Sequence, residues 1–306
     1  MTFSNKNLIM IFLAVPAVII AGICLWRFFG NETDRGDIFL SDNLASADLV
    51  FKVDYNWNFF NEAIKNYPYN EEVVEPGVVG LVVPHHDLAA AYSAEAFQKI
   101  CSYDIERVII VGPNHGDFGA AAVITGNIVY DLPAGRVYSE TELIKDLVSR
   151  GLAVEDVPLL SSEHSIYTVV PYVHYCFPDA KIIPLILSSR LPLEEAVNLG
   201  RYLSSYINDK TIIVGSIDFS HYLSSEEAGS RDQETKDAIL RRDYELIYSF
   251  NDEHIDSPAS AVLVLNAAGE YGAGKIDIIR IANQAEAMGA KSLTSSTSYF
   301  TILLRK

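Results

Sequence analysis

The fold is decided by the stretch Val78-Val79-Gly80-Leu81-Val82-Val83-Pro84-His85-His86-Asp87. Its first six residues are apolar or glycine, which is typical of a strand buried on both faces of a parallel sheet. Two histidines and an aspartate follow directly. The loops beyond the strand ends of an open α/β sheet converge on one crevice, where ligands bind. The stretch therefore predicts a buried strand that carries polar residues to a ligand site.

The same alternation of apolar runs and polar turns continues along the chain. We expect further strands at Val108–Val111, Ala121–Thr125, Ile182–Leu187, Ile212–Gly215, Lys275–Ile281 and Ser295–Leu304. Helix-like segments lie among them at Leu88–Ile100, Glu140–Arg150, Leu193–Ile207, Arg231–Phe250 and Ala259–Gly269. This order of elements predicts one doubly wound α/β domain over residues 46–306, with αβα layers around a mostly parallel sheet.

Composition limits the classes of partner. Hydrophobic residues make up 49% of the 306 residues, which is enough for a large core. The formal net charge of −17 repels phosphate backbones, so we expect no nucleic acid partner. The three cysteines, Cys24, Cys101 and Cys176, are too few for a structural zinc site built on thiolates. A Cys101–Cys176 disulfide would need an oxidising compartment, and the spacing of the two cysteines does not by itself indicate that they pair.

The amino-terminal segment predicts a membrane anchor. Leu8 to Trp26 is a run of nineteen uncharged residues, which as a helix spans about 28 Å, close to the thickness of a bilayer core. Bulky residues follow it instead of a small-residue cleavage site, so a retained anchor is favoured over a cleaved signal peptide. We expect residues 1–30 to form a transmembrane signal-anchor and residues 31–45 a linker. The flanking positive charges weakly favour a single-pass protein with an extracytoplasmic domain.

Histidines also follow other predicted strands and loops. They occur in Gly112-Pro113-Asn114-His115-Gly116, in Glu163-His164-Ser165 and in Asp218-Phe219-Ser220-His221. Imidazoles and carboxylates that meet in one crevice have the composition of a metal site or an acid–base site. An aspartate near a histidine can also orient the imidazole and raise its basicity, as Asp218 can for His221. Each motif alone is equally explained by a turn or a loop, with Asp87 as the cap of the next helix.

The tripeptide Asp256-Ser257-Pro258 precedes the last predicted helix. Proline suits the first helical turn, and either Ser257 or Asp256 suits the N-cap. Capping explains these residues fully, but it does not prevent Asp256 from facing the crevice, because helix amino termini often do.

Taken in order, these motifs resemble the MEMO-like family, also called AmmeMemoRadiSam system protein B. Its members share an αβα fold with the class III (LigB-type) extradiol ring-cleavage dioxygenases. The resemblance runs from about Val78 to the C-terminus. The matching residues are Pro84-His85, Gly112-Pro113-Asn114-His115, Glu163-His164-Ser165-Ile166 with Pro171-Tyr172, Asp218-Phe219-Ser220-His221 and the closing strand Ser295–Leu304.

The resemblance implies a metal site. The family's pocket uses the two matching histidines, here His85 and His115, and a cysteine at the start of a late helix. This chain lacks that cysteine, and alignment of the helix places Asp256 there, while a slip of one residue would place Ser257. Two histidines and a carboxylate form the ligand set of non-haem Fe(II) oxygenases. A carboxylate in place of a thiolate favours Fe(II), Zn(II) or Mn(II) over Cu(I).

Three functions follow as expectations. By analogy with the dioxygenases, the site would cleave catechol rings, with His221 as the base, Asp218 orienting it and His164 assisting. A second hypothesis is a protein that binds metal or a peptide in the same cleft without turnover. A third is hydrolysis by a metal-bound water, with His221 as the base. In each case we expect a small-molecule or peptide ligand in the cleft.

Overall fold

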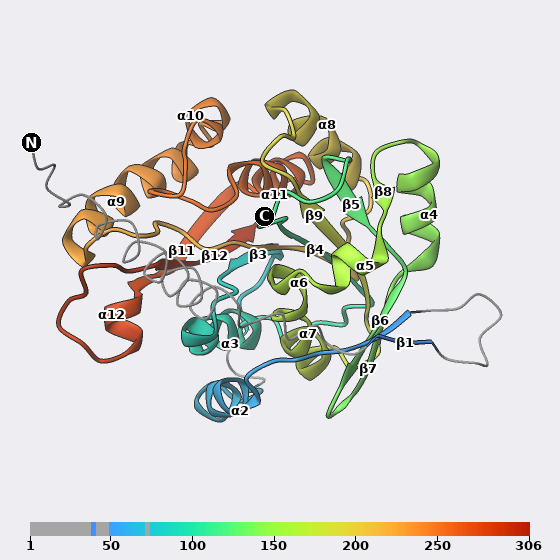
Figure 1. Cartoon of the computed structure of the whole chain (residues 1–306), viewed down its shortest axis with the longest axis horizontal. Coiled ribbons are helices and arrows are strands. Elements are labelled where there is room, and N and C mark those ends of the chain that lie inside the picture. The colour runs from blue at the N-terminus through green and yellow to red at the C-terminus, as the bar shows by residue number, and fades with distance from the viewer. Residues whose placement is uncertain (1–37, 41–48, 71–73) are drawn as a thin grey trace, which may run out of the picture. The chain divides into compact units, whose positions relative to one another are not determined.

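Strand β3 (Val78–Val83) lies within the large sheet of this chain, whose computed structural model describes residues 38–40, 49–70 and 74–306 (Figure 1). On one side β3 pairs with the parallel strand β10 (Thr211–Ser216). Beyond β10 follow β4 (Arg107–Pro113) and β9 (Lys181–Leu187), both also parallel to their neighbours. These four strands form the parallel centre that the apolar runs predicted, and their carboxyl ends share one edge.

Antiparallel strands flank this centre. β12 (Ser298–Arg305) pairs with β3, and β11 (Lys275–Asn283) pairs with β12. On the other side, β5 (Val123–Thr125) is antiparallel to β9, and the short β8 (Val154–Glu155) is parallel to β5. The large sheet is therefore mixed, which corrects the expectation of a mostly parallel one.

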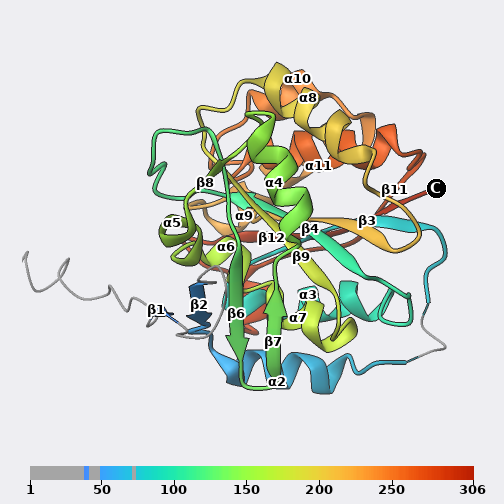
Figure 2. The same ribbon diagram turned by 90° about the vertical axis from the view of Figure 1, so that its right-hand side faces the viewer.

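A second, smaller sheet has the order β1-β2-β6-β7. Its strands are β1 (Ile38–Leu40), β2 (Leu49–Lys52), β6 (Ile128–Leu132) and β7 (Gly135–Tyr138), and β6 and β7 form a hairpin visible in Figure 2. None of the four was expected, and β1 lies within the predicted linker. β7 begins directly after the hairpin turn with Gly135, whose φ of 153° suits glycine.

Helices cover both faces of the large sheet, as Figures 1 and 2 show. One face packs on α4 (Thr141–Ser149), α8 (Leu193–Ser204), α9 (Ser225–Arg241), α10 (Tyr244–Tyr248) and α11 (Pro258–Glu270). The other packs on α2 (Trp57–Asn66), α3 (Ala90–Gln98), α5 (Val157–Ser161), α6 (His164–Tyr167) and α7 (Val170–Cys176). The short helices η1 (Asp87–Ala89) and α12 (Gln284–Ala287) complete the elements.

The residues of β4 show why the runs are continuously apolar. Ile109 and Val111 belong to one core cluster, whereas Val108 and Ile110 belong to the other. Successive side chains of a strand point to opposite faces, so a strand covered on both sides needs an apolar residue at every position. This arrangement confirms a single α/β domain with αβα layers.

The helix expected over Arg231–Phe250 is two helices. Arg242 ends α9 in the left-handed conformation, with φ at 53°. Its guanidinium donates hydrogen bonds to the carbonyls of Leu265 and Ala273, at 2.7 and 2.5 Å. Because these partners lie far away in sequence, local periodicity could not reveal the break.

Cys101 and Cys176 form a disulfide with a Cα–Cα distance of 4.6 Å. It joins the chain just after α3 to the last residue of α7. The spacing of the cysteines did not indicate this pairing, because the two helices meet only through the packing of the fold.

The predicted anchor, residues 1–30, lies outside the described residues, as does most of the predicted linker. Within the described ranges, no helix has both the length and the apolar character needed to cross a bilayer.

Candidate metal centre

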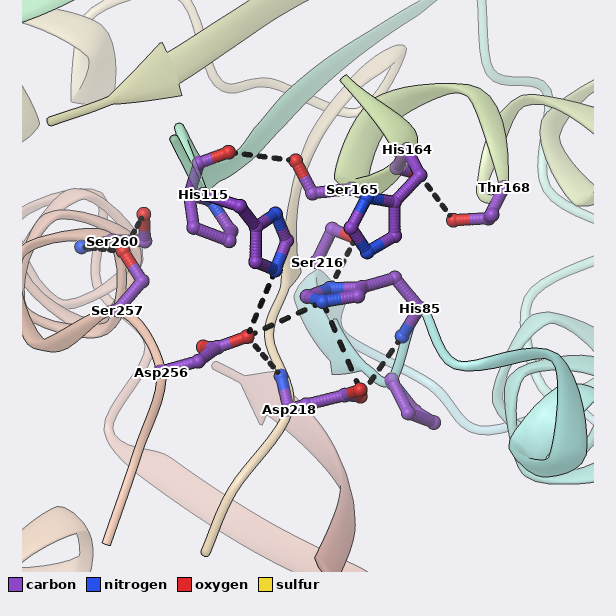
Figure 3. A network of polar contacts seen from close by, with 12 residues as sticks. His85, His115, His164, Ser165, Thr168, Ser216, Asp218, Asp256, Ser257 and Ser260 are labelled. Atoms are coloured by element: carbon purple, nitrogen blue, oxygen red, sulfur yellow. Dashed lines mark hydrogen bonds and ion pairs between the residues drawn. The ribbon is translucent and has the colours of Figure 1, made fainter. Parts of the chain in front are cut away.

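Three imidazoles meet at the carboxyl ends of the parallel strands (Figure 3). His85 follows β3, His115 follows β4, and His164 begins α6. One ring nitrogen from each lies within 4.8 Å of the others. The rings of His115 and His164 stack with centroids 4.2 Å apart, and the His85 ring stands nearly perpendicular to both. The structure therefore brings together three of the histidines that the sequence singled out.

Gly112 allows α6 to approach β4 this closely. A Cβ atom at this position would lie 2.6 Å from the Ser165 hydroxyl oxygen, which is too close. That hydroxyl donates a hydrogen bond of 2.9 Å to the carbonyl of Pro113. The glycine of this motif thus permits the contact that places His164 beside His115.

Glu163 contacts both of the stacked histidines. Its Oε1 is 2.7 Å from His115 Nδ1 and 3.3 Å from His164 Nδ1. Its Oε2 accepts a 3.0 Å hydrogen bond from the backbone N–H of His115, and its Oε1 accepts one from that of Ser165. Glu163 is the buried N-cap of α6, so this motif begins a helix rather than forming a loop.

Two aspartates face His85 from other segments. Asp256 Oδ2 lies 3.3 Å from His85 Nε2 and 4.0 Å from His115 Nε2. Asp218 Oδ2 lies 3.7 Å from His85 Nε2, and its Oδ1 accepts a 3.1 Å hydrogen bond from the backbone N–H of His85. The backbone N–H of Asp218 in turn donates to Asp256 Oδ2. The two carboxyl groups and His85 therefore form one buried unit.

Burial sets the protonation preferences of this unit. It raises the pKa of Asp218 to about 7, and it raises that of Asp256 well above the ordinary value, with the Asp218 charge adding to the effect. Burial, followed by the neighbouring imidazoles, lowers the pKa of His85 and takes that of His164 to about 4. At neutral pH the imidazoles of His85 and His164 are thus neutral, the form that binds metal ions.

The donor set fits a divalent cation. Asp256 Oδ1 is buried and has no hydrogen-bond partner among the residues that the structure describes, and a buried acceptor without a partner is unfavourable. The side chain of His115 is 35% exposed, whereas that of His85 is only 2% exposed, so the cluster opens to solvent on one side. Neutral imidazole nitrogens and carboxylate oxygens suit Fe(II), Zn(II) and Mn(II).

The adjacent residues Asp256 and Ser257, which precede α11, have different roles. The Ser257 hydroxyl caps the helix through the backbone N–H of Ser260, and Pro258 occupies the first turn. Asp256 is the one that faces the histidines (Figure 3). At η1, by contrast, the cap is His86 rather than the expected Asp87, because His86 Nδ1 accepts from the Leu88 N–H.

His221 is not one of the three clustered histidines, but it lies near enough to them to contribute to the lowered pKa of His85. Its backbone N–H donates to the Asp252 carbonyl at 2.7 Å, and burial lowers the pKa of its imidazole. Its Nδ1 is buried without a hydrogen-bond partner among the described residues. The Asp218 carboxyl contacts His85, and no contact joins it to His221 in the described structure. The expected orientation of His221 by Asp218 is therefore not seen.

A buried polar network fixes the turn that carries Asp218 and His221. The Ser220 hydroxyl donates to Asp232 Oδ1 at 3.0 Å, and the Ser298 hydroxyl donates to Asp232 Oδ2 at 2.7 Å. The backbones of Phe219 and Ser298 are also hydrogen-bonded. This turn of the site is thus held by α9 and by the start of β12.

Comparisons with known proteins show which family the chain resembles in sequence and fold. A family model described as Memo-like protein matches residues 58–303. A MEMO1 family protein of Caldivirga maquilingensis is 24% identical over 264 residues, which cover 82% of this chain and 91% of that protein. One from Pyrobaculum aerophilum is 29% identical over 236 residues, which cover 74% and 83%. The crystal structure of an uncharacterized Escherichia coli K12 protein has a TM-score of 0.51 at 16% identity, covering 74% of this chain and 98% of that one. The last likeness shows the fold alone.

Proposed function

This chain belongs to the Memo-like family, and we propose on that premise that it binds one divalent metal ion through His85, His115 and Asp256. The observation that carries the proposal is the position of Asp256 Oδ2, which lies 3.3 Å from Nε2 of His85 and 4.0 Å from Nε2 of His115. Small movements would bring all three atoms to the roughly 2.0–2.2 Å ligand distances of such ions.

We propose further that the site is an oxidoreductase centre of the extradiol dioxygenase type, with Fe(II) as its metal. Two histidines and one carboxylate would hold the ion, and a bound Fe(II) would supply the redox chemistry that joins dioxygen to a catechol ring. In this scheme His221 accepts a phenolic proton and His164, stacked on His115, contacts the substrate from the open side. Asp218 holds the backbone of His85 and so positions that ring.

Metal binding and oxygen uptake test this function. Protein loaded with Fe(II) should bind about one equivalent and consume dioxygen with a panel of catechols, forming yellow ring-opened products. Alanine at His85, His115 or Asp256 should weaken binding strongly, whereas His174→Ala and His254→Ala serve as matched controls outside the cluster. The His221→Ala variant should bind metal but lose activity. Absence of oxygen uptake across the panel would remove the dioxygenase proposal.

Metal-assisted hydrolysis is the second candidate, and one observation favours it. His164 offers a third imidazole nitrogen within 4.8 Å of those of His85 and His115. Three histidines with an open position are a ligand set of catalytic zinc, which turns bound water into a nucleophile near neutral pH. Under this alternative, His164→Ala weakens Zn(II) binding more than Asp256→Ala does. Binding of metal or peptide without any turnover would instead indicate a non-catalytic protein.

We also propose that residues 1–30 anchor the protein in a membrane and that the domain lies on its extracytoplasmic side. The Cys101–Cys176 disulfide supports this side, because disulfides persist mainly in oxidising compartments. Cell fractionation should find the full chain in membranes, and a chain lacking residues 1–30 should be soluble and folded. A protease added to intact spheroplasts should digest the domain; protection of the domain would reverse the orientation.

A further inference from the structure

Glu163 is the carboxylate that touches two of the three clustered imidazoles. Its Oε1 lies 2.7 Å from His115 Nδ1 and 3.3 Å from His164 Nδ1. Its side chain is only 7% exposed, so water does not compete effectively for these contacts. It belongs to neither the three-histidine cluster nor the proposed ligand set.

The remaining contacts of Glu163 fix its orientation. Oε2 accepts from the backbone N–H of His115 at 3.0 Å, and Oε1 accepts from that of Ser165 at 3.1 Å. A carboxylate held by two backbone donors can act only as an acceptor toward a third partner. His115 must then carry its proton on Nδ1, which leaves the lone pair of Nε2 directed toward Asp256 and the centre of the site.

We propose that Glu163 is a positioning residue that holds His115, and with it His164, in the tautomer and orientation needed for metal binding. The inference rests on the proposed metal site and extends it. Carboxylates that accept from the second nitrogen of a ligating histidine orient the ring and increase its basicity, and their loss typically lowers metal affinity 10- to 100-fold. Glu163 therefore influences the metal through His115 without being a ligand.

The tautomer can be measured without metal or substrate. In two-bond proton–nitrogen NMR spectra of the metal-free full-length protein, His115 should show a proton on Nδ1 in the wild type. The Glu163→Ala variant should lose that preference, and Glu163→Gln, whose amide oxygen can still accept, should keep much of it. An unchanged tautomer in Glu163→Ala would overturn the proposal.

Co(II) is the probe for the metal. Competition with a chromophoric chelator should show Co(II) affinity reduced 10- to 100-fold in Glu163→Ala, with a changed visible spectrum, and reduced less in Glu163→Gln. Asp156→Ala is the matched control, because Asp156 caps the preceding helix α5 through the Leu159 N–H without touching the cluster. It should lower the melting temperature and leave the Co(II) affinity unchanged.

The two proposals fail in different ways. A wild type that binds no Co(II) overturns the metal site. A wild type that binds Co(II), with Glu163→Ala and Glu163→Gln binding it equally well and with the same spectrum, overturns the role of Glu163 and leaves the metal site standing. Absence of catechol turnover affects neither result.

Discussion

The Asp256 carboxyl lies against the His85 imidazole, with Oδ2 3.3 Å from Nε2, although the two residues come from different layers of the domain. His85 follows β3, and Asp256 precedes α11, which packs on one face of the sheet. Both side chains are nearly inaccessible to water. The imidazole of His85 is neutral, and the pKa of the Asp256 carboxyl is raised. A metal ion bound between them would favour the ionised carboxylate and would so stabilise the pair.

Replacement of Asp256 by alanine should lower Zn(II) or Co(II) affinity at least tenfold, because a charged ligand is lost. Isothermal titration calorimetry measures the change. The control is Ser257→Ala, which removes the N-cap of α11 and should cost about 1 kcal/mol of folding stability while the metal affinity stays the same. Equal metal affinity in Asp256→Ala and the wild type would return Asp256 to a structural role.

Reduction of the Cys101–Cys176 disulfide should destabilise the domain. The cysteines are 75 residues apart. A disulfide that closes a loop of that length raises the free energy of the unfolded chain by about 4 kcal/mol. Urea unfolding followed by circular dichroism should therefore show a lower midpoint in the presence of a reductant. In a variant with serine at both positions, the reductant should have no effect. A wild-type midpoint that does not respond to reduction would contradict the prediction.

The stability of the domain should depend on pH through Asp232. Burial raises the pKa of Asp232 to about 6, against the opposing hydrogen bonds from Ser298 and Ser220. The folded protein therefore holds the proton of the Asp232 carboxyl more tightly than the unfolded chain does. The resulting contribution to the free energy of unfolding is fully present below the ordinary pKa of 3.8 and is lost as the pH rises through 6. The loss amounts to about 3 kcal/mol.

Asp232→Asn should flatten this part of the profile. The difference in unfolding free energy between variant and wild type, measured by urea titration from pH 4 to pH 7, isolates Asp232 from the other buried acids. Asp237→Asn is the matched control, because Asp237 is exposed on the same helix α9. Parallel profiles for wild type and Asp232→Asn would show that the carboxyl titrates normally.

Tyr222 should give the folded protein less backbone stability than a glycine would at the same position. Its φ is 62°, a left-handed conformation that costs a residue with a Cβ about 1–2 kcal/mol. Its side chain is 76% exposed, so its removal costs little packing. Tyr222→Gly should therefore be more stable than Tyr222→Ala by about 1 kcal/mol in urea unfolding. A more stable alanine variant would indicate that this backbone is not strained.

The parallel centre of the sheet could be predicted from the sequence because its strands contain continuous apolar runs. Strand β3 occupies the predicted range Val78–Val83, and the runs that formed β4, β9 and β10 were also recognised. The smaller sheet was missed, because β2 and β7 are only four residues long and carry exposed residues such as Lys52 and Arg136. Pairing between such short segments depends on the tertiary fold.

The site was predictable where a motif ends a strand and less so where it follows a loop. His85 and His115 lie together, as expected from the convergence of strand ends. Glu163 lay in a segment read as a loop, and its burial depends on the contact between Gly112 and Ser165, which only the packing of α6 reveals. The contact between Asp218 and His85 was also not predictable from the sequence. The Asp218 carboxyl is oriented by a hydrogen bond from the backbone N–H of His85, which only the tertiary fold brings near it.

The position of β12 has a consequence for biosynthesis. β12 is the latest strand in chain order, yet it lies between β11 and β3, and its first residue holds the turn that carries Asp218. A chain emerging from the ribosome has made His85, His115 and His164 long before this strand exists. The turn that carries Asp218 therefore lacks its Ser298 partner until synthesis reaches residue 298, so the candidate metal centre reaches its final geometry only after translation of nearly all of this sequence.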